Sequence, residues 1–419
     1  MSKLTTYKFC KLYEMNSGIS SKPEQAGHGS PFLSFSTVFN NYFIPEDLDD
    51  LMDTSDEEQE KYSILKGDIF LTRTSEVVDE LAMSSVALEN YSNATYSGFL
   101  KRLRPLQKDI TYHKFMAFYL RSTLFRKTMT NNAVLTLRAS LNENIFSYLD
   151  LILPDYKEQV KIGDLLYLIN QKIDLNNRIN AELEVMAKMI YDYWFIQFDF
   201  PDKNGKPYKS SSGKMVYNKT LEREIPKEWE DNNILAIAEL LGGGTPSKKN
   251  ESYWGGQIPF FTPTDADNHI FKLTTADLIT EEGLKNCSSK LFEKGTIFIA
   301  ARGSVGKMAI VANKMAMNQS CYAFKARKGI SYSYLFFCVK ELIHHLRVKS
   351  SGSVFKSIVS NDIKHTNMVI PTTDLIQDFG RKVEPLFEEI LVKTIENQQL
   401  IRLRDWLLPM LMNGQITVK

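Results

Sequence analysis

The chain has 419 residues, 43% of them hydrophobic and 24% charged, which is an ordinary globular composition with room for two or three domains. Its formal net charge of +1 singles out no class of partner, so a DNA-binding surface would have to come from local arrangement. The four cysteines show no metal or disulfide spacing, the start lacks an apolar signal core, and no run reaches about 18 apolar residues; these features predict a cytoplasmic protein with no membrane span.

Residues 1–153 are predicted to form a first domain. A strand is expected near 31–39, followed by an acidic stretch at 46–60 that we interpret as solvent-exposed. The turn Lys66-Gly67-Asp68 leads into a strand that ends at Thr72, directly before Arg73. Further strands are expected near 83–88 and 99–105, and a helix from 112 to about 128. Short strands mixed with helices indicate the α+β class.

Residues 154–199 are predicted to form a first long helix. Its apolar residues recur about every 3.5 positions, which is typical of a coiled-coil seam. The seam includes Ile169, Ile173, Asn180 and Leu183. At roughly 1.5 Å per residue, a helix of this length extends over about 50 Å. Asp155 and Glu158 form a capping pattern at its start, with Asp in place of Ser or Thr.

The seam recurs 217 residues further along the chain. The second copy includes Leu386, Ile390, Asn397 and Leu400. Asn180 falls on Asn397 at this offset, and Pro154 falls on Pro371 (371 − 154 = 217). We therefore interpret 200–228 as a linker, 229–371 as a second domain and 372–419 as a second long helix. Two unrelated helices with ordinary Leu and Ile stripes are the alternative.

The two seams carry further predictions. A buried Asn180 or Asn397 would fix the register of the helices at a cost in stability, so Leu at both positions should raise Tm and blur the spacing of the domains. In an antiparallel pair the two asparagines would face each other only near the crossing point. Pro385 interrupts the second stripe alone, so the second helix is expected to kink or to begin there.

The sequence predicts no catalytic or metal site. GSVGKM at 303–308 invites comparison with a phosphate-binding loop, but Ala301 and Met308 stand where that motif needs Gly and Ser or Thr. No acidic-x-Lys pair on a strand follows either Pro-Asp dipeptide as a nuclease would require, and no HExxH, GxSxG or GxGxxG string occurs. The aminomethyltransferase string, Asn or Asp followed by two prolines and an aromatic residue, is also missing. We expect a non-catalytic chain without a metal or cofactor of its own.

Polar loops suited to DNA recur once in each domain. Base edges are read by Arg, Lys, Asn and Gln, and phosphates by Ser, Thr, Lys and backbone amides. Each loop alone could be an ordinary exposed turn, but the repeated set favours two binding modules. Arg73 and Arg302 are the strongest base-reading candidates, because each lies just beyond a repeated strand. The predicted DNA contacts are Arg73, Thr74, Ser75, Arg102, Arg138, Gly244, Thr245, Ser247, Lys248, Thr264, Arg302, Ser304, Lys307, Ser351, Ser353 and Lys356.

Three strings carry a resemblance to a known family: AELEVMAKMIYDYWFIQFDFPDKNGKPYKSSSGKMVYN, IPKEWE with GGGTPSKKNESYWGGQIPFFTPTD, and LRDWLLPMLMNGQITV. With these strings the chain resembles the specificity subunit of a Type I restriction–modification enzyme over essentially its whole length. The first domain departs from the pattern because it lacks a GGTP-like opening. The resemblance implies an α+β fold with two similar target-recognition domains, separated by an antiparallel pair of long coiled-coil helices with an internal pseudo-twofold repeat.

The resemblance also implies a function and partners. The expected partners are double-stranded DNA with a split target, two methyltransferase subunits that use S-adenosylmethionine, and a separate translocating restriction subunit. The alternative is a two-domain adaptor that binds proteins without reading DNA. Preferential binding of one split-sequence duplex over scrambled DNA would separate the two hypotheses.

Overall fold

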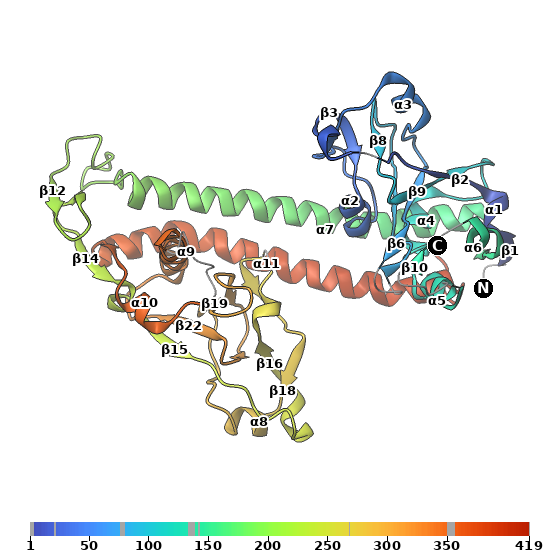
Figure 1. The fold of residues 1–419 in the computed structure, drawn as a ribbon. Helices are drawn as coiled ribbons and strands as arrows, with labels where there is room; N and C mark the ends of the chain where they lie inside the picture. The colour runs from blue at the N-terminus through green and yellow to red at the C-terminus, as the bar shows by residue number, and fades with distance from the viewer. Residues whose placement is uncertain are drawn as a thin grey trace. The chain divides into compact units, whose positions relative to one another are not determined.

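The computed structural model describes residues 4–20, 22–75, 80–132, 139–140, 143–267, 269–349 and 357–418 (Figure 1). The chain divides into two units, residues 1–174 with 398–419, and residues 175–397. Each unit holds one globular domain and one part of each of two long helices. These helices are α7 (Tyr156–Tyr191) and α11 (Thr373–Met412).

The domain of the first unit is built on an antiparallel four-stranded sheet and a three-stranded sheet. The larger sheet has the order β2 (Tyr13–Ser17), β9 (Leu100–Pro105), β5 (Ile69–Thr72) and β7 (Ser84–Val86). The smaller has the order β4 (Leu51–Met52), β3 (Ala26–Leu33) and β8 (Thr95–Tyr96). Two further pairs are β1 (Thr5–Lys8) with β11 (Asp150–Leu153), and β6 (Thr74–Ser75) with β10 (Ala139–Ser140). The helices are α1 (Phe9–Leu12), η1 (Pro23–Gln25), α2 (Phe35–Asn40), α3 (Asp56–Lys61), α4 (His113–Tyr119), α5 (Thr123–Asn132) and α6 (Glu143–Tyr148).

The domain of the second unit has a five-stranded and a three-stranded sheet. The larger has the order β15 (Ala238–Gly242), β22 (Cys321–Ala326), β19 (Ile297–Ala300), β20 (Met308–Val311) and β17 (Phe271–Lys272). The smaller has the order β18 (Asp277–Ile279), β16 (Trp254–Phe261) and β21 (Ala316–Met317). The remaining pairs are β14 (Glu230–Asn233) with β23 (Asn367–Ile370), and the hairpin β12 (Met215–Asn218) with β13 (Arg223–Pro226). The helical segments are the π-helical turn η3 (Asp192–Ile196), η4 (Ile234–Ala236), η5 (Glu251–Tyr253), η6 (Pro263–Asp265), α8 (Glu281–Lys285), α9 (Tyr332–Lys349) and α10 (Ser360–Lys364).

The two domains share one topology, which confirms the predicted duplication. The order β2-β9-β5-β7 in the first corresponds to β15-β22-β19-β20 in the second, and β4-β3-β8 corresponds to β18-β16-β21. The register agrees as well: the parallel pair Leu33↔Tyr96 corresponds to the parallel pair Phe261↔Met317. In both domains the central strand follows a glycine of positive φ, Gly67 at 90° and Gly295 at 85°, a conformation that glycine adopts without steric cost.

Each hydrophobic core combines a domain with both long helices. In the first unit, Ile162 and Leu166 of α7 and Leu411 of α11 join the domain core. In the second unit, Tyr191 of α7 and Phe379 of α11 join it. Burial of these aliphatic and aromatic side chains is the main stabilising contribution to each unit.

Glycines let the domains approach the helices closely. A Cβ atom on Gly163 of α7 would lie 2.6 Å from the backbone nitrogen of Phe115. At the corresponding position of α11, Gly380, it would lie 2.8 Å from the Cβ atom of Ser331. Any larger residue would push α4 or the start of α9 away from the helix on which it packs.

The helices pair antiparallel within the second unit, where polar side chains lie in the seam. The Asn180 amide donates to Thr394 Oγ1 at 3.5 Å, and the Asn397 amide donates to Asn177 Oδ1 at 2.8 Å. The offset of 217 converts one pair into the other (397 − 180 = 394 − 177), so the same contact is made twice. Asn176 adds a hydrogen bond to Asn397 Oδ1 at 2.9 Å. Asn180 and Asn397 therefore each bind the opposite helix, as a register-fixing role requires.

The other seam positions behave as their periodicity predicts. Ile169, Ile173 and Ile390 are buried, and Leu183, Leu386 and Leu400 are half-buried. At the start of α7, Asp155 Oδ1 accepts from the Glu158 backbone amide at 3.0 Å, which confirms the predicted cap.

Four local predictions need correction. The strand expected near 31–39 ends at Leu33, because Ser34 caps helix α2. The helix expected from 112 to about 128 is two helices, α4 and α5. Helix α11 begins at Thr373 and continues through Pro385, which is exposed. The segment predicted as a linker forms the hairpin β12–β13.

Candidate nucleic-acid interface

In the second domain, the loop after β15 packs against the segment after β21. The Gly244 amide donates to the Met317 carbonyl at 3.1 Å. A Cβ atom on Gly243 would lie 2.1 Å from the Asn318 carbonyl oxygen, so this approach requires glycine. The Thr245 hydroxyl donates to Gln319 Oε1. The GGTP string therefore serves to seat this loop on its neighbour.

Two further loops join the same place. The Ser320 carbonyl accepts from the amides of Ala301, at 2.8 Å, and Arg302, at 3.3 Å. The Asn318 amide donates to the Phe261 carbonyl at 2.9 Å, directly before the loop that holds Thr264. Three predicted loops (243–248, 262–265 and 301–307) thus meet around 318–320. We name these four segments the second-domain loop cluster.

The exposed side chains of this cluster match most of the predicted contacts. Ser247, Lys248, Thr264, Arg302 and Lys307 are exposed, and Thr245 and Ser304 are half-buried. Gly244 is buried and can act only through its backbone. Ser351, Ser353 and Lys356 lie outside the described residues.

Sequence reasoning missed Asn318, Gln319 and Ser320, although three consecutive polar residues directly before a strand are a signal for a functional loop. Gln319 is exposed beside Thr245 and has the amide chemistry that reads adenine.

The first domain contains the corresponding loop cluster. The Ile19 amide donates to the Tyr96 carbonyl at 2.9 Å, as Gly244 does to Met317. A Cβ atom on Gly18 would lie 2.3 Å from the Ser97 carbonyl oxygen, as at Gly243. The first domain lacks a GGTP-like string, as noted from the sequence, and Gly18-Ile19-Ser20 occupies the equivalent place.

Arg73 is exposed, but its structural counterpart differs from the predicted one. The Arg73 amide donates to the Phe99 carbonyl at 2.8 Å, as that of Ala301 does to Ser320. The residue that corresponds to Arg302 is Thr74: Thr74 pairs with Ser140, and Arg302 with Ser357. The two arginines thus lie one position apart on equivalent loops.

Thr74 is half-buried. The Ser75 side chain and Arg138 lie outside the described residues.

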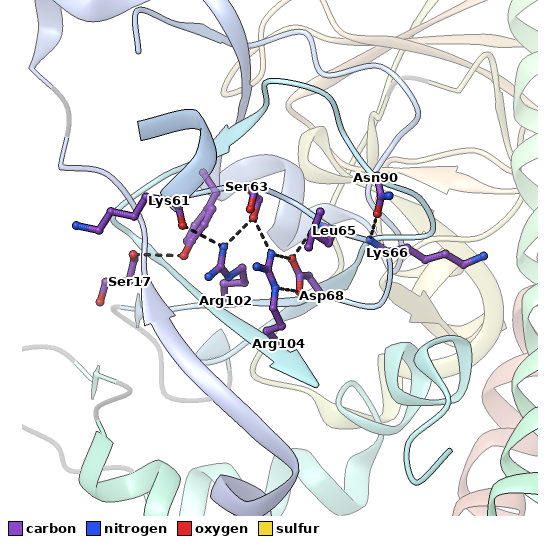
Figure 2. Close-up of polar contacts among 10 residues, drawn as sticks. Ser17, Lys61, Ser63, Leu65, Lys66, Asp68, Asn90, Arg102 and Arg104 are labelled. Atoms are coloured by element: carbon purple, nitrogen blue, oxygen red, sulfur yellow. Dashed lines mark hydrogen bonds and ion pairs between the residues drawn. The ribbon is translucent and has the colours of Figure 1, made fainter. Parts of the chain in front are cut away.

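The predicted DNA contact at Arg102 is wrong, because this side chain lies in the interior with 5% of its surface exposed. Its Nη1 donates to the Ser63 carbonyl at 2.7 Å, and its guanidinium lies 5.4 Å from the centre of the Tyr96 ring. Figure 2 shows it beside Arg104, which forms two hydrogen bonds of 2.8 and 2.6 Å with the buried carboxylate of Asp68. The hydrogen bonds to Asp68 raise the pKa of Arg104 above its usual range.

This internal network reaches the first-domain loop cluster. The Tyr96 hydroxyl donates to the Ser17 carbonyl at 3.3 Å, and Lys101 Nζ donates to Ser17 Oγ at 2.7 Å. Ser17 directly precedes Gly18. Burial raises the pKa of Tyr96 to about 12, so its hydroxyl remains a donor at neutral pH. Lys101 directly, and Arg102 through the Tyr96 ring, therefore hold Ser17 and the loop that follows it in place.

Two tandem α+β domains with equivalent loop clusters define a protein built from a duplicated domain. Residues 9–185 and 226–398 match the family model described as the Type I restriction modification DNA specificity domain. The chain belongs to this family.

Curated relatives agree with this assignment. The chain is 24% identical to the Type I restriction enzyme HindI specificity subunit of Haemophilus influenzae, over 92% of this chain and 94% of that protein. It is 35% identical to the MjaIX specificity subunit of Methanocaldococcus jannaschii, over 36% of each chain. Among solved structures, the S subunit from M. genitalium shares the fold with a TM-score of 0.60 and 13% identity, covering 98% of this chain and 96% of that one.

Within the described residues, no helix is long and apolar enough to cross a membrane. In the same part of the chain, no three His, Cys, Asp or Glu side chains form a group that could hold a metal ion.

Proposed function

We propose that this chain reads a split DNA target, with one half-site contacted by each domain. The observation that carries the proposal is the duplicated loop cluster: Gly18–Ser20 with Arg73 in the first domain, and Gly243–Ser247 with Arg302 in the second. Membership of the DNA specificity domain family supports the same reading.

The exposed side chains of the clusters divide into two roles. Arg73 and Arg302 would read base edges, since a guanidinium can bind guanine O6 and N7 with two hydrogen bonds. Thr264, Lys307 and the backbone amides would bind phosphates, which position the protein without carrying sequence information. Specificity would then depend on few residues, and affinity on many.

The helix pair would fix the separation of the two half-sites. The seam asparagines bind across the pair through Thr394 and Asn177. A shift of one helix along the other would break both contacts at once. Register, and with it the spacing of the two domains, would thus be a property of the helix pair.

Two methyltransferase subunits are the proposed protein partners. Met186 and Met189 of α7 are 50% and 65% exposed in the second unit. Leu403 and Trp406 of α11, which lie 217 residues further on, are 44% and 64% exposed in the first unit. Exposed apolar side chains on one helix face mark partner sites. Repeating them at equivalent positions suits two copies of one partner, which would bring S-adenosylmethionine, while a separate subunit would restrict and translocate.

The test uses this chain in complex with its methyltransferase. The complex should retard one split-sequence duplex more strongly than scrambled DNA at moderate salt. Arg73→Ala should weaken recognition of one half-site and Arg302→Ala recognition of the other, each by about 1–3 kcal/mol. Equal losses on all sequences would instead make either residue a phosphate contact.

Mapping of methylated bases in the host genome, with and without this gene, supplies the target. Loss of methylation at one split sequence is expected on deletion. If the complex binds all DNA equally and methylation is unchanged, the adaptor hypothesis replaces the proposal.

A further inference from the structure

The second unit contains a cavity of about 590 Å³ between α7, α9 and the loop that ends at Lys307. Cationic side chains converge on it from all three elements: Lys188 from α7, Lys340 and Arg347 from α9, and Lys307 from the loop. Two histidines also line it. An anion would meet several positive charges there at once.

The carboxylates near the cavity offset only part of this charge. Asp267 is paired with Lys272 at 2.9 Å, so its charge is already matched. Burial raises the pKa of Glu184, while the charge of Lys340 lowers it, so Glu184 faces Lys340 across the cavity lining. Lys188 is paired with Asp192 on its own helix. Among the described residues, neither Lys307 nor Lys340 has an ion pair.

The cavity is continuous with the second-domain loop cluster. Lys307 ends the loop that begins at Arg302. Gly306, with a φ of 80°, turns this loop beneath α9, and Arg347 Nη2 donates to the Val305 carbonyl at 3.2 Å. One short segment therefore joins the proposed base-reading arginine to the cationic cavity.

The corresponding position in the first domain is built differently. The parallel bridges Phe43↔Val86 and Phe271↔Ile310 place Tyr42 at the position of Ile270, which lines the cavity. The Tyr42 ring lies 4.8 Å from the guanidinium of Arg121 and 5.0 Å from that of Arg404, so it covers both charges. In the second domain Ile270 stands in place of the ring, and the exposed cations Lys188, Lys307 and Lys340 lie at positions other than those of Arg121 and Arg404.

We propose that this cavity receives backbone phosphates of the DNA that flanks the second half-site. This inference rests on the proposed function and assigns the second domain an additional contact, which adjoins its loop cluster at Lys307. DNA is favoured over an acidic protein segment because the cavity shares the Arg302–Lys307 loop with the base-reading site. The contact would be independent of sequence, since it involves phosphates alone.

The experiment compares Lys340→Gln and Lys340→Glu with Lys328→Gln, an exposed lysine in the turn before α9 that does not line the cavity. Affinities of the methyltransferase complex for the split target and for scrambled DNA are measured from 50 to 200 mM salt. Loss of one phosphate contact lowers the slope of log K against log salt by about 0.9, so the affinity ratio across this range falls about 3.5-fold. We expect this change for Lys340→Gln on both DNAs, a larger loss for Lys340→Glu, and no change for Lys328→Gln.

Three results would overturn the inference. A salt slope equal to that of the Lys328→Gln control would show that no phosphate reaches the cavity. Weaker methyltransferase association with unchanged DNA affinity would assign the cavity to an acidic partner segment. Binding of inorganic phosphate that Lys340→Gln abolishes, with the DNA slope unchanged, would assign it to a small anion. If the wild-type complex fails to prefer the split target, the proposed function fails, yet the slopes on scrambled DNA still test the cavity.

Discussion

Replacing Arg102 with alanine separates a structural role from a DNA contact. In the folded protein its guanidinium binds the Ser63 carbonyl at 2.7 Å and lies over the Tyr96 ring. Alanine removes this donor and leaves the half-buried Ser63 carbonyl with Arg104 Nη2, at 3.0 Å, as its remaining partner. Ser63 lies in the segment between α3 and β5, and Tyr96 directly precedes the loop cluster, so the change loosens both.

The magnitude follows from these two contacts. A hydrogen bond from a charged donor contributes about 1.5–3 kcal/mol, and a desolvated cation–ring contact about 1–2 kcal/mol. Among the described residues the Nε of Arg102 has no hydrogen-bond partner, and removing this buried donor relieves about 1 kcal/mol. The free energy of unfolding of the first unit should therefore fall by about 1.5–4 kcal/mol.

The matched control is Arg73→Ala, the same substitution at an exposed arginine. It should change the free energy of unfolding by no more than about 0.5 kcal/mol while weakening half-site recognition. Urea denaturation gives the stability, hydrogen exchange of the β9 amides assigns the loss to the first unit, and DNA affinity is measured where both variants are folded. Unchanged stability of Arg102→Ala together with selective loss of DNA binding would refute the structural role.

Three further substitutions test the helices and their packing. Gly163→Ala should lower the free energy of unfolding by about 1–3 kcal/mol, because the new methyl group would clash with backbone atoms of α4. Pro385→Ala, at an exposed site in α11, should raise the free energy of unfolding by up to about 3 kcal/mol, because it restores a helical amide. Asn397→Leu should cost about 1–3 kcal/mol, because it leaves Asn176 and Asn177 without the hydrogen-bond partner that they share. Tm should therefore fall, whereas the sequence alone predicts a rise. Burial lowers the pKa of His113 from 6.5 to about 4, so the unfolded state takes up the proton first and stability should be lost as the pH falls from about 6.5 towards 4.

Denaturation midpoints measure each of these effects. Gly163→Ala and Pro385→Ala both improve helix propensity, by about 1 and about 3 kcal/mol, but only Gly163→Ala creates a close contact. A gain in stability for Gly163→Ala would contradict the close approach at Gly163. A higher midpoint for Asn397→Leu would show that the seam amides contribute only to register. His113→Gln should flatten the pH dependence, and an identical slope in that variant would remove this histidine as its source.

The duplication could be predicted because its signal is local and repeated. Helix geometry sets the periodicity of a seam, so two helices that pack in the same way show the same pattern in the sequence. The constant offset between Asn180 and Asn397 is part of that pattern. The strands after Gly67 and Gly295 could also be predicted from the sequence, because a glycine turn before an apolar run determines where a strand begins.

The fate of Arg102 could not be predicted, because its partners are distant in sequence. The string KRLR has the composition of an exposed basic patch. The burial of this string depends on the Ser63 carbonyl, which binds Arg102, and on the Asp68 carboxylate, which binds Arg104. Both partners come from a segment more than thirty residues earlier (102 − 68 = 34). The counterpart of Arg73 was misjudged for a related reason, since only the strand register shows that Ala301 occupies its place.

The division of the chain has a consequence for its synthesis. Residues 175–397 form a continuous unit, whereas the first unit combines residues 1–174 with residues 398–419. Leu408 and Leu411 complete the core that Phe9 and Tyr13 begin. On the ribosome, the earliest part of the polypeptide therefore stays incomplete until the final turns of α11 emerge, and the later-made domain can finish folding first. A chain that ends before residue 398 would therefore lack part of the core of the first unit, although most of that unit is translated first.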